Sequence, residues 1–266
     1  MTSNPEEFEL FLRGLSKREN KECGTPTLGA VLRALSVSQP RSYIFIFTNG
    51  PAMDYYLISK VLEKVTEKQS QVVFVLGEQC AVPNHVGYQV YDRIALHSSG
   101  QVLRIKKSDV NLALKFVESS IQINKVHLLS VNSKGPAART FTFLVDRHLK
   151  NILVSTVGER HVRMRLKYPP KTSVGANKFQ KIIKKKDMIV TKILRPQAGM
   201  WNITIKSTGN YSVRISSESS FFVSFGFATE HHRSNIDKVK LNRRPVMGKS
   251  YLFIYFYIFV FHLLFL

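Results

Sequence analysis

The sequence predicts an α/β doubly wound domain followed by an antiparallel β-sandwich. Two continuous apolar runs, SYIFIFTNG at 42–50 and QVVFVLGEQC at 71–80, are typical of strands buried on both faces of a parallel sheet. Segments with apolar residues at helical spacing alternate with such runs, which is the pattern of a doubly wound sheet. After about residue 125 the chain changes to short alternating runs divided by turn residues, which is typical of a β-sandwich.

The elements of the first half follow from the spacing of apolar residues. Helices are expected at 8–15, 28–35, 54–68, 88–95 and 110–121, and strands at 43–48, 71–76 and 101–105. The last helix is expected to bury a stripe made of Val110, Leu114, Val117 and Ile121. Three strands are few for a doubly wound sheet, and the chain opens on a helix. We therefore expect residues 1–124 to be a partial domain whose front strands are missing.

The second half contains short runs with strand character, and we expect a sandwich over residues 125–228. The runs lie at 126–131, 140–145, 151–157, 162–168, 188–194, 201–206, 211–216 and 221–227. Residues 229–250 are polar and basic and are expected to be a linker. The N-terminus has no apolar stretch of the kind found in secretory signals, so no signal peptide is expected in this chain.

The C-terminal residues 251–266 form a hydrophobic tail without any charged residue. This tail is shorter than the ~20 residues that a helix needs to span a bilayer. Two explanations stay open. In the first, the tail is a membrane anchor. In the second, it is translated intron, because codons for Gly248, Lys249 and Ser250 can contain the usual start of an intron.

The chain is strongly basic, with a formal net charge of +21 and a pI of about 10.1, which favours polyanionic partners. Twelve Lys or Arg residues lie between 160 and 195, against one acid. The candidate anion-binding residues are Arg163, Arg165, Lys167, Lys184, Lys185 and Lys186. Two interpretations have equal weight. The residues form a solvated edge strand whose charges prevent pairing with other sheets, or they form a strip that binds sulfated glycans or acidic lipid. Nucleic acid is disfavoured, because Tyr168 and Phe179 are expected in the core and no nucleic-acid motif is found.

In a parallel sheet the ligand site lies at the carboxyl ends of the strands, where Asn49 is found. Asn49-Gly50 is expected to be a tight turn with Asn49 in the left-handed conformation, and Asp54 is expected to cap the helix that follows. Cys23 and Cys80 are expected near the same edge, where a disulfide and two free thiols both remain open. No CxxC pair exists, which excludes a zinc site of the usual spacing.

Two N-x-S/T sequons flank a predicted hairpin turn in the second half. They begin at Asn202 and Asn210, which are therefore candidate N-glycosylation sites. Two such triplets at neighbouring strand positions favour an extracellular sandwich over a cytosolic one.

Several separated segments resemble one family. The TPTLGA segment at 25–30, followed by SYIFIFTNG, resembles the second half of a von Willebrand factor A domain. Further similar segments are KQSQVVFVL at 68–76, VGYQVYDRIALHSSGQV at 86–102, KVHLLS at 125–130, AGMW at 198–201 and YSVRI at 211–215. These resemble the N-terminal region of hemicentins, large extracellular matrix proteins, and the β-sandwich that follows it there.

The resemblance implies a secreted adhesion protein without enzymatic activity, with matrix or cell-surface proteins as partners. It also implies an ancestral site for Mg²⁺ or Ca²⁺ at the top of the sheet. Thr25 matches the family's threonine ligand, Asn49 falls where an aspartate is expected, and the DxSxS motif is absent. Divalent cations of this kind require mostly anionic oxygen ligands. We therefore expect a degenerate remnant that binds no metal, and no cofactor.

The sequence thus favours a hemicentin-like matrix or cell-adhesion fragment. The alternative is a basic intracellular scaffold that binds nucleic acid or acidic membrane. An enzyme is disfavoured, because neither a nucleophile–base pair nor a paired acid motif is evident.

Overall fold

The computed structural model describes residues 2, 4–15, 23–78, 80, 85–122, 124–169, 178–228 and 252–259; the side chains of 178, 222–228 and 252–259 are not described. The linker expected at 229–250 lies outside these residues. The elements of the first half are α1 (Pro5–Arg13), α2 (Thr27–Val37), β1 (Tyr43–Thr48), the 3-10 helix η1 (Tyr55–Leu57), α3 (Ile58–Lys68), β2 (Gln71–Leu76), α4 (Val86–His97), β3 (Val102–Arg104), the 3-10 helix η2 (Lys107–Asp109) and α5 (Val110–Ser120).

Local signals explain several helix ends. Pro5 occupies the first turn of α1, and the side chain of Asn4 caps that helix by accepting a hydrogen bond from the Glu6 amide at 3.0 Å. The imidazole of His85 caps α4 by accepting from the Gly87 amide at 3.0 Å. Helix α3 ends at Lys68, and its C-cap Gln69 adopts a left-handed conformation with φ of 51°.

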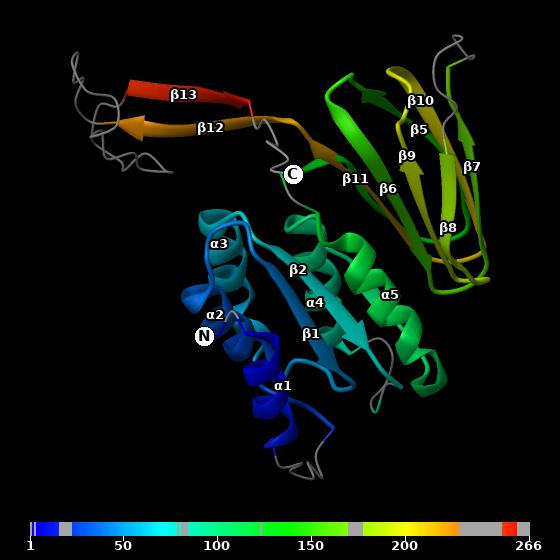
Figure 1. Cartoon of the computed structure of the whole chain (residues 1–266). Helices are drawn as coiled ribbons and strands as arrows, with labels where there is room; N and C mark the ends of the chain where they lie inside the picture. Colours follow the sequence, from blue (N-terminus) through cyan, green and yellow to red (C-terminus); the bar gives the residue numbers. More distant parts are fainter. Residues whose placement is uncertain are drawn as a thin grey trace.

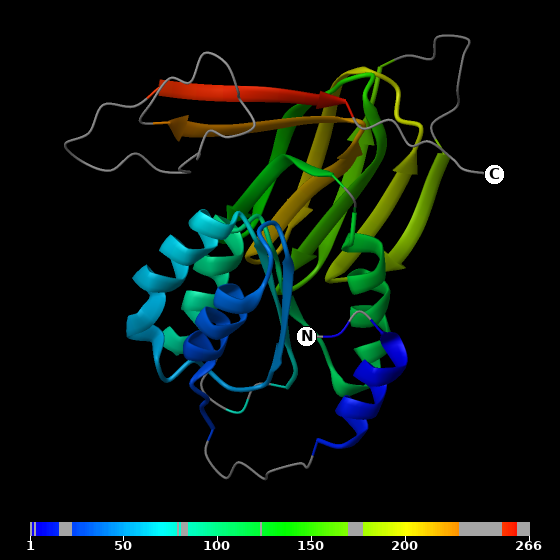
Figure 2. The ribbon, with the colours of Figure 1, turned by 60° about the vertical axis from the view of Figure 1, so that its left-hand side comes forward.

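The described strands of the first half form a parallel sheet in the order β1-β2-β3, which confirms the predicted fold class. Helices α2, α3 and α4 lie on one face of this sheet and α5 lies on the other (Figures 1 and 2). Apolar side chains of α2, α3, α4 and alternate positions of β1 and β2 form the first core. Leu28, Val61 and Ile94 in this core are fully buried.

The prediction that β1 is buried on both faces is wrong. Strand β2 is buried almost throughout, whereas β1 is only half-buried and Phe47 is 58% exposed. The reason is position, because β1 is the edge of the sheet among the described strands and β2 is its centre. The continuous apolar run correctly predicts a strand but does not reveal how many neighbours the strand has.

The second half is the predicted antiparallel sandwich. A three-stranded sheet in the order β5-β10-β7 faces a five-stranded sheet in the order β4-β11-β6-β9-β8. The strands are β4 (Lys125–Ser133), β5 (Ala137–Val145), β6 (Leu149–Gly158), β7 (Val162–Lys167), β8 (Lys178–Lys184), β9 (Met188–Leu194), β10 (Gly199–Ser207) and β11 (Tyr211–Ser219). The core between the two sheets contains Trp201, Ile203, Ile152 and Val213, all without exposed surface.

Two strand assignments differ from the sequence-based expectation. Strand β8 was not expected, because its sequence KFQKIIK carries three cations and alternates poorly. The run at 221–227 does form a strand, β12 (Phe221–Ala228), but it does not join either sheet of the sandwich. It pairs antiparallel with β13 (Leu252–Phe259) from the hydrophobic tail, and the two form a separate two-stranded sheet (Figure 1).

The tail therefore supplies a strand at 252–259. Within the described part of the chain, no helix is both long enough and apolar enough to cross a membrane. The intron explanation for the tail stays a prediction.

The two halves share a third core. Val73 and Val75 of β2, together with Phe116 of α5, pack with Leu153 of β6 and Val190 of β9. Strand β6 is consequently buried on both faces, since its alternate residues point into the sandwich core and into this junction. The five-stranded sheet and α5 thus cover the face of the parallel sheet opposite α2, α3 and α4 (Figure 2).

The predicted orientation of α5 is wrong. Phe116 is 3% exposed and Ala113 is fully buried, whereas Leu114 of the expected buried stripe is 52% exposed. Both faces of this helix are apolar, and the junction with the sandwich selects the face that carries Ala113 and Phe116. Helix α1, also expected to be amphipathic, forms but buries none of its residues.

The burial of α5 can be tested by two alanine substitutions. Phe116→Ala is expected to lower the free energy of unfolding by about 3–5 kcal/mol, because it leaves a cavity in the shared core. Leu114→Ala, the matched control on the other face, is expected to cost less than about 1 kcal/mol. Denaturant unfolding followed by circular dichroism measures both. A larger loss for Leu114→Ala than for Phe116→Ala would contradict the observed orientation.

Candidate functional site

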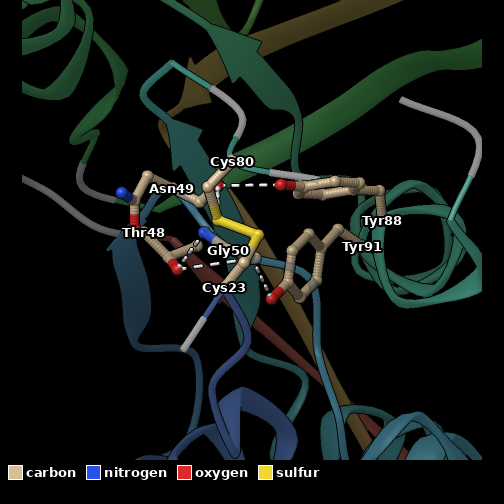
Figure 3. Close-up of a disulfide and its surroundings, with 7 residues drawn as sticks. All are labelled: Cys23, Thr48, Asn49, Gly50, Cys80, Tyr88 and Tyr91. Carbon is tan, nitrogen blue, oxygen red and sulfur yellow. Dashed lines mark hydrogen bonds between the residues drawn. A yellow bond between two sulfur atoms is a disulfide. The ribbon is translucent and has the colours of Figure 1, made fainter. Parts of the chain in front are cut away.

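The carboxyl ends of the parallel strands lie at one edge of the sheet, where three chain segments meet. Asn49 follows β1, Cys80 follows β2, and Cys23 precedes α2. The structure joins Cys23 and Cys80 by a disulfide with a Cα–Cα distance of 5.5 Å (Figure 3). Of the two alternatives that the sequence left open, the structure therefore has the bridge.

Two tyrosines of α4 hold the loop at Asn49-Gly50. The Tyr88 hydroxyl donates to the Asn49 carbonyl oxygen at 2.8 Å, and the Tyr91 hydroxyl bonds to the Gly50 carbonyl oxygen at 3.0 Å (Figure 3). Tyr91 also hydrogen-bonds the Thr27 hydroxyl at 2.8 Å, and burial raises the pKa of Tyr91 to about 12. Asn49 does not have a positive φ, so the predicted left-handed turn is wrong. The loop at Asn49-Gly50 is held by its hydrogen bonds to the two tyrosine hydroxyls.

Asp54 caps a different helix from the one expected. Its Oδ1 accepts from the Leu28 amide at 3.0 Å and its Oδ2 from the Gly29 amide at 2.7 Å, both in the first turn of α2. It makes no side-chain cap of the helix that follows it. A buried carboxylate is stabilised there, because the N-terminus of a helix offers unpaired amides and a positive dipole. Gly29 permits this approach, since a Cβ there would lie 3.3 Å from Oδ2.

The available oxygen atoms do not suit a divalent cation. The Thr25 hydroxyl is hydrogen-bonded to the Thr27 hydroxyl at 2.7 Å, Asn49 offers a neutral amide, and Asp54 is committed to α2. Among the described residues, no group of three or more His, Cys, Asp or Glu side chains is arranged to hold a metal ion. Mg²⁺ and Ca²⁺ require several hard oxygens with enough negative charge to offset dehydration. The side chains at this edge of the sheet instead make structural contacts within the protein.

The predicted cations of β7 lie on the outer face of the three-stranded sheet. Arg163, Arg165 and Lys167 are exposed, and they alternate with Val162, Met164 and Leu166, which point toward the sandwich core. Lys206 of β10 lies directly opposite Arg163 in the strand register, which adds a fourth cation. We call Arg163, Arg165, Lys167 and Lys206 the cation face. None of the four forms an ion pair with any residue that the structure describes.

The three predicted lysines at 184–186 do not act together. Lys184 and Lys186 are exposed, and the Lys186 carbonyl accepts from the Val162 amide at 2.7 Å, which brings this turn to the start of β7. Lys185 instead forms an ion pair with Asp109 of η2 in the first half. Lys185 therefore belongs to the contact between the domains and not to the cation face.

The expectation that Tyr168 and Phe179 are core residues is wrong. They are 38% and 39% exposed, and their rings lie 5.6 Å apart. Tyr168 also contacts the buried Trp201, with ring centroids 5.3 Å apart. These aromatic rings extend from the core to the surface beside Lys167, so their supposed burial no longer counts against nucleic acid.

Both sequon asparagines are at the surface. Asn202 is half-buried in the middle of β10, where its Oδ1 accepts from the Thr142 hydroxyl at 2.6 Å. Asn210 is exposed in the turn before β11. Its Oδ1 accepts from the Gly135 amide at 2.6 Å and its Nδ2 donates to Glu159 at 2.9 Å.

Sequence reasoning missed the polar residues at the junction of the domains. Arg214 is buried there and donates to the carbonyl oxygens of Gly100 at 2.5 Å and Val131 at 2.8 Å. Burial lowers the pKa of Arg214 to about 10, and the negative charge of Asp92 opposes this shift. An arginine in an alternating strand gives no signal that a second domain covers it.

A cleft of about 620 Å³ opens at one end of this junction. Lys125 lies in it, donates to Gln71 Oε1 at 2.7 Å, and sits 5.0 Å from the centre of the Tyr43 ring. Burial lowers the pKa of Lys125 to about 7.

Comparisons with known proteins agree with this arrangement. Residues 1–107 match the family model of the von Willebrand factor A domain, and residues 125–220 match the hemicentin galactose-binding domain-like model. Hemicentin-1 of Mus musculus is 37% identical over 259 residues, which cover 93% of this chain and 4% of that protein. The chain is therefore homologous to hemicentins over about nine-tenths of its length. Hemicentin-2 of Mus musculus is 36% identical over 86% of this chain, again covering 4% of its own length.

The chain thus spans about 4% of the hemicentins that it matches. A solved lipase, Bacillus licheniformis BlEst2 in its propeptide form, aligns with a TM-score of 0.25 and 10% identity, covering 81% of this chain and 72% of that one. A score this low carries no argument about fold or activity.

The disulfide can be tested by a serine pair. Replacing Cys23 and Cys80 together with serine is expected to lower the free energy of unfolding by about 4 kcal/mol, because the bridge closes a loop with a sequence separation of 57. Denaturant unfolding of the variant and of the oxidised chain measures the difference. Mass spectrometry of non-reduced peptides provides the control for bond formation. Free thiols in the folded chain, purified without reductant, would contradict the bridge.

Proposed function

We propose that this chain is a secreted, non-enzymatic adhesion module of the extracellular matrix that binds sulfated glycans through its cation face. One observation carries the proposal: four cations lie together on an outward sheet surface without acidic partners among the described residues. Matrix or cell-surface proteins are further partners, and the kinship with hemicentins supports this setting.

The arrangement of the cation face favours a linear polyanion. Alternate residues of a strand lie about 6.6 Å apart on one face, so Arg163, Arg165 and Lys167 form a straight row. The sulfates of an extended chain can contact such a row in succession. Thr140, Thr142 and Thr204 add hydroxyl groups on the same surface. The row also protects the edge of β7 from pairing with other strands, and this role is compatible with binding.

Adhesion by this chain is proposed to be independent of a bound metal. The oxygen atoms at the carboxyl edge of the parallel sheet are engaged within the protein or carry no charge. No cofactor is therefore invoked. The same reasoning supports a non-enzymatic role, since Tyr88 and Tyr91 hold backbone carbonyl groups in place and the Thr27 hydroxyl is bonded to that of Tyr91.

Binding to heparin tests the cation face. The variant Arg163→Gln, Arg165→Gln, Lys167→Gln is expected to bind heparin oligosaccharide at least about tenfold more weakly, because each Lys or Arg near an anionic surface contributes on the order of 1 kcal/mol. Isothermal titration at two salt concentrations measures the affinity. The salt dependence is expected to fall along with it.

The matched control removes the same charge elsewhere. Arg33→Gln, Lys60→Gln, Lys115→Gln replaces three exposed cations of the first half and is expected to bind heparin nearly as the unmodified chain does. Equal losses in both variants would show that net charge alone drives binding and would contradict the proposal. Tighter binding to phosphatidylserine vesicles or duplex DNA than to heparin would favour the alternative, a basic intracellular scaffold.

Thermal melting tests independence from metal. About 10 mM MgCl₂ or CaCl₂ is expected to leave the melting midpoint unchanged relative to NaCl of equal ionic strength, because a ligand of the folded state would raise it. Asn49→Asp is expected to behave in the same way, since Thr25 and Asp54 stay committed to other groups. A metal-dependent rise in the unmodified chain would contradict the proposal. A metal-dependent rise of the melting midpoint in Asn49→Asp alone would show that only the neutral amide of Asn49 prevents metal binding.

A further inference from the structure

The sequon at Asn202 and the cation face occupy the same surface. In the antiparallel register of β10 and β7, Asn202 lies directly opposite Lys167 and Thr204 lies directly opposite Arg165. Residues that face each other in this way point to the same side of a sheet, with Cβ atoms about 4.5–5.5 Å apart. The two residues that define the sequon are therefore the immediate neighbours of two cations.

The local geometry of Asn202 suits a sugar that points into solvent. The neighbouring Trp201 and Ile203 point into the core, so the side chain of Asn202 points outward. Its Oδ1 is occupied by the Thr142 hydroxyl, whereas its Nδ2, the atom to which a glycan is attached, donates to no group among the described residues. A glycan on Nδ2 leaves the bond to Thr142 intact.

The second sequon differs in position and provides a contrast. Asn210 lies in the turn beyond the end of the β10–β7 register, which closes with Ser207 opposite Val162. It precedes β11, a strand of the other sheet. A glycan at Asn210 therefore starts outside the row of cations.

We propose that N-glycosylation of Asn202 shields the cation face, so that a sulfated glycan binds more weakly to molecules in which Asn202 carries a glycan. The inference rests on the proposed function of that face. An N-linked glycan is bulky and hydrated, and this one begins next to Lys167 and within about 7–8 Å of the diagonal neighbour Arg165. It blocks access by a polyanion without changing the charges. Two paired strands thus carry the proposed binding residues, on β7, and the sequon whose glycan would cover them, on β10.

Heparin binding by glycosylated and trimmed protein tests the proposal. The full chain is expressed behind a secretion signal in mammalian cells, alongside Asn202→Gln and Asn210→Gln, and intact mass gives the occupancy of each sequon. Asn202→Gln is expected to bind heparin about tenfold more tightly than the glycosylated chain, and Asn210→Gln is expected to bind like the glycosylated chain. Trimming uses an endoglycosidase that leaves one sugar, because an amidase would create an aspartate beside Lys167. The trimmed chain is expected to approach Asn202→Gln.

Three results overturn the inference. The first is a bare Asn202 in the secreted protein. The second is an occupied Asn202 whose removal leaves heparin affinity unchanged while the three cation substitutions abolish it; the proposed function then survives and only the inference fails. The third is Asn202→Gln binding heparin equally with and without Arg163→Gln, Arg165→Gln and Lys167→Gln, in which case the proposed function fails as well.

Discussion

The packing of the sandwich against the parallel sheet is the contact on which the rest of the structure depends. Val73 and Val75 of β2 meet Leu153 of β6 in one apolar core, and Arg214 bridges the halves through backbone carbonyl oxygens. Buried donors and acceptors are costly unless they are paired. Gln101 meets this requirement by bonding Ser155 at 2.6 Å and Ser212 at 3.0 Å. The two domains are therefore one packed unit, and the five-stranded sheet has no solvent face at their contact.

This junction decides which surfaces remain for binding. It covers much of the outer face of the five-stranded sheet, whereas the outer face of the three-stranded sheet is left for solvent, together with its four cations. The carboxyl edge of the parallel sheet, where ligands usually bind in α/β folds, is instead closed by the disulfide, by Asp54 on α2 and by two tyrosine hydroxyls. The proposed binding surface therefore lies on the sandwich and not at the carboxyl edge of the parallel sheet. The cation face gains from the rigid support beneath it, because Trp201 and Ile203 are fully buried behind it.

Much of the fold was predictable because its signals are local. Strands at 43–48 and 71–76 were predicted with the bounds observed, since continuous apolar runs between turn residues mark strands without reference to the rest of the chain. The positions of Cys23 and Cys80 at one edge follow from the same pattern, but their bond requires a Cα distance that only the fold supplies. Strand β8 was missed, because cations interrupt its alternation and its stability comes from pairing with β9.

The sequence by itself determined the order of elements, the two domain classes, the alternation that turns Arg163, Arg165 and Lys167 outward, and the kinship with hemicentins. The tertiary structure alone decided which face of α5 is buried, which helix Asp54 caps, and that Asn202 lies beside Lys167. The physical reason is the sequence distance over which each interaction acts. Periodicity reports a residue's own helix or strand, whereas burial, capping across 25 or 26 residues and strand register depend on partners distant in the sequence.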